Sequence, residues 1–506
     1  MKVFANRFLR FAAIPVLAAL TLTAWVVASP VGASPDDDFH LVSAWCAGPT
    51  AAETCQPVAG EPRQREIPRS LTLAPCYVAD PDKSAGCQEG LFSNILNDTG
   101  ASTRGNFSRG GYPPVYYAAI GQFTTLDVQA SVLTMRLVNI GVFLAFTVSL
   151  FWLLPRRLKP VLVGGWLITT VPLGLFIITS VNPGSWALTG VVSSWIALLG
   201  WFESAGRRKI ALGVIFALAV VVAAGSRGDA AMFAGFGMVL AAVFAYRHDR
   251  RFWLDLILPF VMGLVALAFF FTSRQINSGL QGFGGGSTNA EQQLGGAGLF
   301  AYNVLNVPWL WAGTLGDWGL GWIHTDMPRV VPLAAIAAFV VVGAAGLAML
   351  TKRKAILLAV MVIALWALPL WVLQAGGDAV GANVNPRYIL PLVVLLGGML
   401  LLQVNGDRLR LSRALRFAVG VALIGAHLVA LHINIRRYVT GLDVGGFDLG
   451  ANAEWWWQGP IGPNAVWLLG SLAYALLLIM ILRNSGGGAA LQATPTQLPA
   501  SRIVGA

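Results

Sequence analysis

The chain has 506 residues, of which 56% are hydrophobic and 11% are charged, and its formal net charge is +11. About a quarter of the residues of a soluble domain are charged, so this chain has too few charges to cover a water-soluble surface. An ordinary soluble enzyme and a disordered protein are therefore excluded. The positions of the positive charges, given below, also exclude a nucleic-acid-binding protein.

Twelve apolar stretches predict transmembrane helices, because each is long enough, at roughly 16–23 residues, to cross the hydrocarbon core of a bilayer. The first covers residues 11–29. Six more fill the region 131–272, at 131–153, 160–180, 184–202, 209–224, 230–246 and 252–272. The last five fill the region 330–482, at 330–350, 355–373, 389–404, 414–431 and 464–482. The sequence thus predicts an all-α integral membrane protein with about 12 transmembrane helices.

Clusters of Lys and Arg stand in six short segments that all fall on the same side of a twelve-span chain. These segments are 2–10, 156–159, 207–209, 247–251, 352–354 and 408–413. Positive residues accumulate on the cytoplasmic side of membrane proteins, so we expect both termini to be cytoplasmic, with residues 1–10 as a short N-terminal segment. The C-terminal segment 483–506 mixes Gly, Pro, Thr and Gln, which predicts a disordered cytoplasmic tail.

An alternative interpretation of residues 11–29 is a cleaved signal peptide. Basic residues precede the apolar run, and the small residues VGA precede Ser34. The loop that follows is extracytoplasmic in both interpretations, so the topology of the remaining chain is unchanged.

The first extracytoplasmic loop, residues 30–130, contains all four cysteines of the chain, Cys46, Cys55, Cys76 and Cys87. An even number of cysteines on the oxidising side of a membrane predicts two disulfides, for which three pairings are possible. The spacing lacks the close cysteine pairs of a zinc site. We therefore expect a small unit stapled by disulfides.

The centres of the predicted spans contain almost no ionisable residues, and His427 alone lies well inside one. Ion-coupled transporters use buried acidic or basic groups near mid-membrane, so the sequence disfavours coupled transport. The polar residues collect instead at the outer ends of the spans.

Three consecutive carboxylates, Asp36, Asp37 and Asp38, follow the first span in the segment SPDDDFHL, which also contains His40. Mutual repulsion and the nearby hydrocarbon raise the pKa of at least one of these carboxyl groups, which suits it to act as a general base. The alternative is a solvated acidic turn that ends the helix, and the spacing alone does not separate the two interpretations.

Three short outer turns accompany the acidic segment. SVNPGSW contains Asn182, GSRGD contains Arg227 and Asp229, and NPRYILP contains Arg387 and Tyr388. A single arginine at the end of an apolar helix often only extends its charge to the membrane surface. Two arginines near a carboxylate cluster favour a phosphate site, because one guanidinium can donate two parallel N–H hydrogen bonds to phosphate oxygens.

The second long outer loop, residues 273–329, has two parts. Residues 273–298 are rich in Gly but lack the GK[ST] of a nucleotide-binding loop, so nucleotide binding is rejected. Residues 299–315 predict an interfacial or re-entrant helix. The segment GDWGLGWIHTDMP follows, with Trp322 and His324. Aromatic rings here could stack on a sugar, although a membrane-interface belt is their commoner role.

Four motifs together resemble a family of bacterial polytopic membrane proteins of the DUF2142 type: SPDDDFH, YPPVYY, GLGWIHTDMP and NPRYILP. The acidic motif after the first span also resembles that of GT-C glycosyltransferases. The resemblance covers most of the chain from Asp36 to Pro391. The family tends to have Glu at Asp37, an acidic residue at His324 and Gly at Pro386.

The resemblance implies a GT-C-like architecture, in which the first seven spans and the first outer loop form the shared module. It implies a polyprenyl-phosphate sugar donor, a cell-envelope glycan or lipid acceptor, and a location in the bacterial plasma membrane. We expect transfer with inversion, with the residues in these roles: Asp36 or Asp37 as catalytic base; Arg387, Arg227 and His40 as ligands of the donor phosphate; Asp38, Tyr388, Asn182, Trp322 and His324 as possible substrate-binding residues.

We expect no required cofactor, because a lipid phosphate leaving group carries less charge than a nucleoside diphosphate. Asp36–Asp38 could still bind Mg²⁺ or Mn²⁺ through their oxygens. The alternative function is an exporter or flippase of a lipid-linked glycan, which needs no carboxylate base. A polysaccharide polymerase or ligase would differ mainly in its acceptor.

Overall fold

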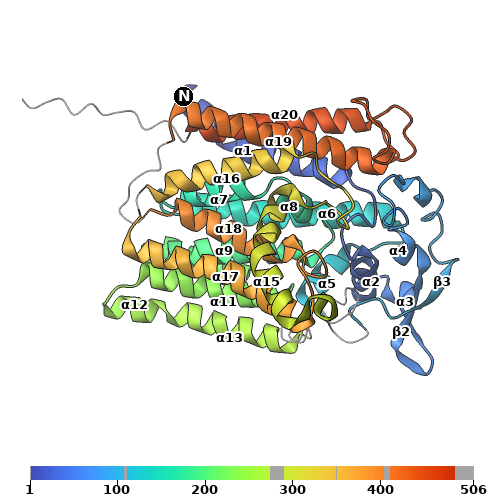
Figure 1. The fold of residues 1–506 in the computed structure, drawn as a ribbon, viewed down its shortest axis with the longest axis horizontal. Helices are drawn as coiled ribbons and strands as arrows, with labels where there is room; N and C mark the ends of the chain where they lie inside the picture. Colours follow the sequence, from blue (N-terminus) through green and yellow to red (C-terminus); the bar gives the residue numbers. More distant parts are fainter. Residues whose placement is uncertain (1, 108–110, 274–289, 349, 404–410, 485–506) are drawn as a thin grey trace, which may run out of the picture.

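The computed structural model describes residues 2–107, 111–273, 290–348, 350–403 and 411–484. Long helices lie side by side along its longest axis, and a smaller unit formed by the first outer loop covers one end of them (Figure 1). We call these parts the bundle and the outer unit.

The helices of the bundle correspond in position to the predicted apolar stretches. In chain order they are α1 (Lys2–Val27), α6 (Val128–Leu153), α7 (Lys159–Thr169), α8 (Leu173–Ile178), α9 (Pro183–Glu203), α10 (Gly206–Ala224), α11 (Gly228–Ala245), α12 (Arg250–Asp255), α13 (Ile257–Thr272), α16 (Val330–Leu347), α17 (Lys352–Gly376), α18 (Pro386–Leu401), α19 (Arg413–Val439) and α20 (Pro463–Asn484).

Within the described ranges, eight of these helical segments are long and apolar enough to cross a membrane: α6, α9, α11, α12 with α13, α16, α17, α19 and α20. Shorter apolar stretches occur in α1, at Ala12–Val27, and in α18. The predicted span 160–180 is interrupted, because α7 ends at Thr169 and α8 begins at Leu173. The count of about twelve spans therefore stays a prediction.

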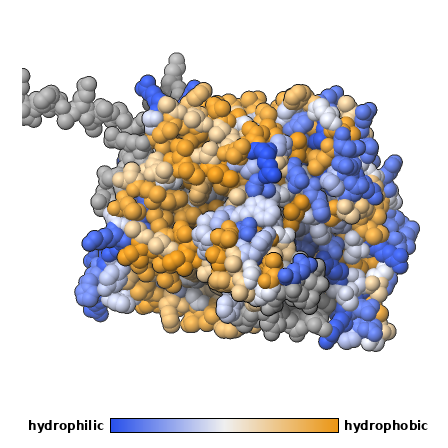
Figure 2. Space-filling view, in the orientation of Figure 1, coloured by the Kyte–Doolittle hydropathy of each residue, from blue (hydrophilic) through white to orange (hydrophobic). Residues whose placement is uncertain are grey.

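The surface of the bundle is apolar, as expected of helices that contact lipid. Figure 2 shows hydrophobic residues across the bundle, with hydrophilic residues over the outer unit and at the opposite tip. Large side chains such as Phe260, Leu333 and Phe417 are exposed on this surface. An exposed apolar surface of this extent would be unstable in water, so the chain is a membrane protein with several apolar helices.

Helix α9 forms the centre of the bundle and contacts α6, α10, α11 and α18. Nearly all of its side chains are buried. Its contact with α10 is close at Gly190, where a Cβ atom would stand 2.6 Å from the backbone nitrogen of Ala223. A glycine is required there because any side chain would push the two helices apart.

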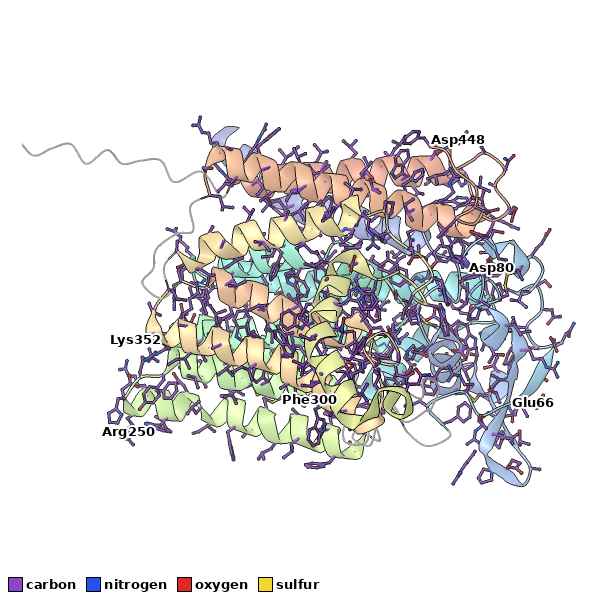
Figure 3. All side chains as sticks on the ribbon, viewed as in Figure 1. Glu66, Asp80, Arg250, Phe300, Lys352 and Asp448 are labelled. Atoms are coloured by element: carbon purple, nitrogen blue, oxygen red, sulfur yellow. A yellow bond between two sulfur atoms is a disulfide. The ribbon has the colours of Figure 1, made fainter. Side chains whose placement is uncertain are left out.

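The basic connections between helices gather at the end of the bundle opposite the outer unit. Figure 3 labels residues at both ends: Arg250 and Lys352 at the basic end, and Glu66, Asp80 and Asp448 at the other. The ion pairs Arg157–Glu203 and Lys209–Asp255 join neighbouring connections of the basic end. Helix α1 begins and α20 ends at this end (Figure 1). Its cytoplasmic orientation stays a prediction.

The outer unit contains a small antiparallel sheet, so the prediction of an all-α protein was wrong in this detail. Strands β1 (Gln56–Val58), β2 (Glu61–Pro68) and β3 (Thr99–Ser102) pair in the order β1-β2-β3. In the register, Pro57 lies opposite Arg65 and Glu66 opposite Ala101. The short helices of the unit are α2 (Asp37–Ala47), α3 (Ala51–Thr54), α4 (Arg69–Leu73), η1 (Ala85–Gln88), α5 (Val115–Ile120) and η2 (Gly121–Phe123).

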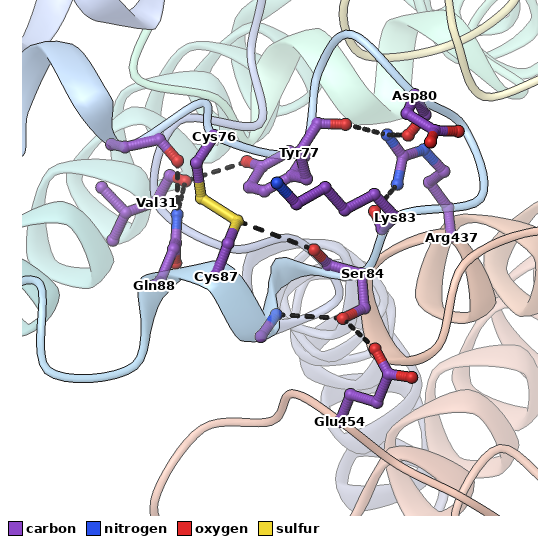
Figure 4. The surroundings of a disulfide bond; sticks show 12 residues. Val31, Cys76, Tyr77, Asp80, Lys83, Ser84, Cys87, Gln88, Arg437 and Glu454 are labelled. Carbon is purple, nitrogen blue, oxygen red and sulfur yellow. Dashed lines mark hydrogen bonds between the residues drawn. A yellow bond between two sulfur atoms is a disulfide. The ribbon is translucent and has the colours of Figure 1, made fainter.

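The prediction of two disulfides is confirmed, and the cysteines pair in sequence order. Cys46 bonds Cys55, and Cys76 bonds Cys87. Around the second disulfide, the guanidinium of Arg437 on α19 donates to the carbonyl oxygens of Tyr77, Asp80 and Lys83 (Figure 4). The outer unit is thereby anchored to the end of α19.

Helix α15 (Ala290–Ala312) and the π-helical turn η3 (Gly313–Asp317) cover the segment 299–315, which was predicted to be interfacial or re-entrant, and α15 begins nine residues earlier. In Figure 1, α15 runs steeply across the long helices. Its Trp311 Nε1 donates to Leu365 O of α17 at 3.0 Å, which fixes it against the bundle. Most of the predicted Gly-rich segment 273–298 and of the predicted tail 483–506 lies outside the described residues.

Candidate functional site

Four chain segments meet where the outer unit joins the bundle. They are the start of α2 with the acidic motif and the outer ends of α9, α11 and α18. Residues far apart in sequence therefore become neighbours. One cavity opens between the outer ends of α9, α11 and α18, and a second lies beside it between α8, η3 and α18.

Asp36 and Arg387 form the ion pair at the centre of this region. Asp36 Oδ2 accepts from Arg387 Nη2 at 2.7 Å, although the two residues are 351 positions apart. Asp36 is the N-cap of α2 and has a left-handed backbone, with φ 62°, a conformation that Asp tolerates better than most residues. Burial raises the pKa of Asp36, but the charges of Arg387 and Arg104 outweigh it, so the pKa lies below its ordinary value.

The guanidinium of Arg387 is nearly buried, with 11% of the side chain exposed, and only part of it is bonded. Besides Asp36, its Nη2 donates to the hydroxyl of Tyr388 at 3.0 Å. Its Nε and Nη1 are buried without a hydrogen-bond partner among the described residues. Such donors cost free energy unless something binds them, which makes them a candidate ligand contact.

Arg227, the N-cap residue of α11, is held differently. Its Nε and Nη2 donate to the two carboxylate oxygens of Asp229, at 2.9 and 2.6 Å. Its guanidinium lies 5.7 Å from the ring centre of Tyr112 and 5.1 Å from that of Tyr388. The same Tyr388 ring lies 5.0 Å from the guanidinium of Arg387, so one aromatic ring is close to both positive charges.

Asp37 lies apart from Asp36, although the two are adjacent in sequence. It is fully buried; its Oδ2 accepts from Ser34 N at 3.0 Å, and its Oδ1 has no partner in the described part of the chain. Burial raises the pKa of Asp37 to about 8, against the opposing charge of Arg136. Asp37 is therefore mostly a neutral acid near pH 7.

Asp38 points to a third partner, on the solvent side. Its two oxygens accept from Arg104 at 2.7 and 2.8 Å, and Arg104 also lies 3.9 Å from Asp36. The three carboxylates thus diverge, and no group of three potential metal-ligand side chains occurs in the described ranges. Mg²⁺ or Mn²⁺ stays an untested expectation from the sequence.

His40 is buried within an aromatic cluster behind Asp36. Its Nδ1 is bonded to the hydroxyl of Tyr117 at 2.7 Å, and its ring packs against Phe39 and Tyr112. Burial lowers the pKa of His40 to about 3, so the ring is neutral and offers no charge to a phosphate. Its predicted role as a phosphate ligand stays a prediction.

The other predicted substrate residues fall into two groups. Asn182 caps α9, and its Nδ2 donates to Ser34 Oγ and Pro35 O, which fixes the acidic motif against that helix. Trp322 donates to Gly32 O at 2.9 Å. Thus Asn182 and Trp322 position the acidic motif, whereas His324 is exposed on the neighbouring loop.

Two small cavities share Arg387 and Ile177 in their walls. The first lies between the outer ends of α9, α11 and α18, and Arg227 and Tyr388 also line it. The second lies between α8, η3 and α18, and Trp318 and Asn385 also line it. The unpartnered nitrogens thus belong to a side chain that borders both spaces.

Sequence reasoning gave no specific role to Tyr112, Arg104 or Asn385, and it treated Trp318 only as one of several aromatic rings that could stack on a sugar. Tyr112 and Asn385 stand in the motifs YPPVYY and NPRYILP, so the motifs themselves were a usable signal. Trp318 stands in the segment GDWGLGWIHTDMP. Arg104 had no such signal beyond its residue type, because its position depends on how the outer loop folds.

Comparison with known proteins gives one family. A family model described as a predicted membrane protein (DUF2142) matches residues 19–396, which include the whole region described above. Among curated proteins, no relative matches the chain.

Proposed function

The chain belongs to the DUF2142 family of predicted membrane proteins, and we propose that it is a GT-C-type membrane glycosyltransferase. It transfers a sugar from a polyprenyl-phosphate donor to a cell-envelope glycan or lipid acceptor, on the outer side of the bacterial plasma membrane. One observation carries this proposal: Arg387 binds Asp36 through one nitrogen, while two further buried N–H groups of the same guanidinium have no partner among the described residues.

The first cavity suits the phosphate end of a lipid donor. Arg387 and Arg227 supply positive charge, and a guanidinium binds phosphate oxygens through paired N–H groups. The rest of the wall is largely apolar, with Ile177, Ala230 and Phe233 among its residues. A cationic spot within apolar walls at the outer ends of membrane helices matches a phosphate attached to an isoprenoid tail.

The reaction is a single displacement at the anomeric carbon. An acceptor hydroxyl forms the new C–O bond, the bond to the lipid phosphate breaks, and its electron pair goes to the phosphate oxygen. The hydroxyl proton goes to the carboxylate of Asp36, which acts as general base. Arg387 and Arg227 stabilise the charge that develops on the departing phosphate.

Of the two carboxylates, Asp36 is the better base. It is ionised at neutral pH, since its pKa is lowered, and it lies on the guanidinium that would bind the donor. Asp37 is mostly protonated near pH 7 and is enclosed beside Arg136. The phosphate of an anionic donor competes with the Asp36 carboxylate for the guanidinium of Arg387. Binding of the donor therefore frees the carboxylate to accept a proton.

The test is transfer by the purified protein in liposomes that contain undecaprenyl-phosphate sugars with labelled hexose or pentose, mixed with cell-envelope extract. Asp36→Asn is expected to slow transfer by about 10²–10⁴-fold, the usual contribution of a general base. Asp98→Asn is the matched control, since Asp98 lies in the same outer unit and its side chain pairs with the exposed Arg69.

Full transfer by Asp36→Asn would overturn the assignment of the base. The exporter or flippase alternative gives a different pattern, in which labelled lipid changes membrane side but the labelled sugar never leaves its lipid phosphate.

A further inference from the structure

At the basic end of the bundle, three positive side chains lie together without an acidic partner among the described residues. They are Arg156, Lys159 and Arg208, and we call them the cationic cluster. We propose that the cationic cluster binds the phosphate of an anionic phospholipid whose acyl chains lie along α10. The proposal does not rest on the proposed function, because the cluster and Arg387 lie at opposite ends of the bundle.

Three chain segments bring the cationic cluster together. Arg156 lies in the connection between α6 and α7, Lys159 is the first residue of α7, and Arg208 lies in the first turn of α10. Arg208 Nε donates to the carbonyl oxygen of Leu153, the last residue of α6, which fixes the start of α10 beside this connection. The cluster therefore depends on the packing of α6, α7 and α10.

The charges of the cationic cluster are close enough to affect one another. Lys159 is partly buried, and its Nζ lies 4.8 Å from the ring centre of Phe151. Burial lowers the pKa of Lys159, and the positive charges of Arg208 and Arg156 lower it further. Because like charges repel, this arrangement costs free energy in the absence of an anion, and a bound anion removes that cost.

Other cations at the same end of the bundle are neutralised within the chain. Arg157 pairs with Glu203, and Lys209 pairs with Asp255. By contrast, no carboxylate of the described ranges forms an ion pair with a member of the cationic cluster. Each neutralised cation directly follows a member of the cluster in the sequence, so paired and unpaired cations stand at one level of the bundle.

Exposed aromatic residues mark the level of the lipid headgroups at this end. The exposed fractions of Trp152 and Trp253 are 61% and 59%, and that of Tyr246 is 41%. Tryptophan and tyrosine collect at membrane–water interfaces, where their rings contact lipid and their polar groups contact water. Trp152 stands four residues before Arg156. The cationic cluster is therefore expected at the depth of the phospholipid phosphates.

The surface of α10 next to the cationic cluster suits acyl chains. Ile210, Val214 and Leu218 are exposed, and their spacing of four residues places them on one face of the helix. From Arg208 to Leu218 the helix rises roughly 15 Å. This rise is half of the hydrocarbon thickness of about 30 Å, so the apolar face matches the acyl chains of one leaflet.

The combination of positive charge and apolar surface selects the ligand. A free phosphate would contact the cations alone, and a zwitterionic phospholipid has an ammonium group that the cluster repels. Phosphatidylglycerol has one negative phosphate, no ammonium group and two acyl chains. It therefore satisfies both features, and basic pockets between membrane helices bind anionic headgroups in this way.

Native mass spectrometry of the purified full chain in detergent measures the binding, by titration with phosphatidylglycerol or phosphatidylethanolamine. The double variant Arg156→Gln/Lys159→Gln removes two charges and keeps the bond between Arg208 and α6. It is expected to weaken the tightest phosphatidylglycerol site about thirtyfold, at about fivefold for each cation. The matched control Arg251→Gln/Lys352→Gln removes two exposed cations of the same end and should bind as the unmodified chain does.

Four results would overturn the proposal: phosphatidylethanolamine binds as tightly as phosphatidylglycerol, the cluster variant binds as the unmodified chain does, the control weakens as much as the cluster variant, or inorganic phosphate displaces phosphatidylglycerol. Thermal unfolding shows whether each variant is folded. If the double variant is misfolded, Arg156→Gln alone decides, since this side chain is exposed and its loss should weaken binding about fivefold. Sugar transfer takes no part in the measurement, so a negative result leaves the proposed function unchanged.

Discussion

The two ends of helix α18 each have a buried cation, and the cations are used differently. At the C-terminal end, Lys354 is fully buried, and its Nζ donates to Leu400 O and Gly346 O at 2.7 Å each. At the N-terminal end, Arg387 binds Asp36 and Tyr388 but leaves two nitrogens without a partner among the described residues. Burial alone is therefore no sign of function. Arg436 on α19 also has buried nitrogens without a partner among the described residues. The distinguishing feature of Arg387 is that its incomplete bonding occurs next to Asp36 and in a cavity wall shared with Arg227.

Among the substitutions considered, that of Arg387 is expected to have the largest effect on sugar transfer. We expect Arg387→Gln to reduce sugar transfer by at least about 10³-fold, because the variant loses the charge that binds and stabilises the departing phosphate. Transfer is measured with labelled undecaprenyl-phosphate sugar in liposomes. The control is Arg329→Gln, which changes an exposed arginine paired with Asp317. A loss of less than tenfold in Arg387→Gln would place the donor elsewhere.

Substitution of Lys354, at the opposite end of α18, should lower the stability of the protein and leave its activity unchanged. Lys354→Met leaves two carbonyl oxygens at helix ends without their donor, which is expected to cost about 1–3 kcal/mol. A lower midpoint of thermal unfolding in detergent measures this effect, and Lys352→Met, an exposed neighbour, is the control. Transfer per folded molecule should be unchanged. Loss of transfer at full stability would contradict a purely structural role for Lys354.

A pH series sharpens the contrast between the two adjacent carboxylates. The pKa of Asp37 is about 8 in the folded chain, and its ordinary value is 3.8. Between these values the folded state holds the extra proton, so Asp37 makes stability fall as pH rises from about 4 to 8, by up to about 1.4 kcal/mol per unit. Asn mimics the neutral acid.

We therefore expect Asp37→Asn to unfold at increasingly higher temperature than the unmodified chain as pH rises from 5 to 8. Asp98→Asn should show no such trend. Thermal unfolding at each pH measures the difference, and parallel curves for Asp37→Asn and the unmodified chain would show that Asp37 is ionised. Transfer at pH 6 is expected to survive this substitution, unlike Asp36→Asn.

The smallest effect is expected at the solvent side of the acidic motif. Arg104 is about half exposed, and its ion pair with Asp38 is therefore screened by water and salt. Arg104→Gln should lower transfer threefold or less, and the difference should shrink at higher salt. Arg63→Gln on strand β2 is the control. A loss as large as that of Arg387→Gln would show that Asp38 and Arg104 belong to the reacting groups.

The sequence allowed the apolar stretches, the two disulfides and the collection of polar residues at one side of the spans to be predicted. These depend on composition and on local patterns, which a single sequence contains. The family resemblance likewise depended on short motifs, and the family match over residues 19–396 confirms it.

The details that decide the chemistry depended on the fold. Asp36 turns to Arg387 while Asp37 turns inward, because one residue, Asp36, has a left-handed backbone. The strands of the outer unit were missed because the segment EPRQREIP is charged and lacks a regular apolar alternation. The second cavity has Trp318 and Asn385 in one wall, and no spacing in the sequence encodes that arrangement.

The most direct measurement is photo-crosslinking with a polyprenyl phosphate that carries a reactive group beside its phosphate, followed by mass spectrometry of the labelled peptides. The account predicts label at the outer turns of α11 and α18, competition by unlabelled undecaprenyl phosphate, and loss of this label in Arg387→Gln. Label spread over the lipid-facing helices, with the same yield in Arg387→Gln, would contradict it.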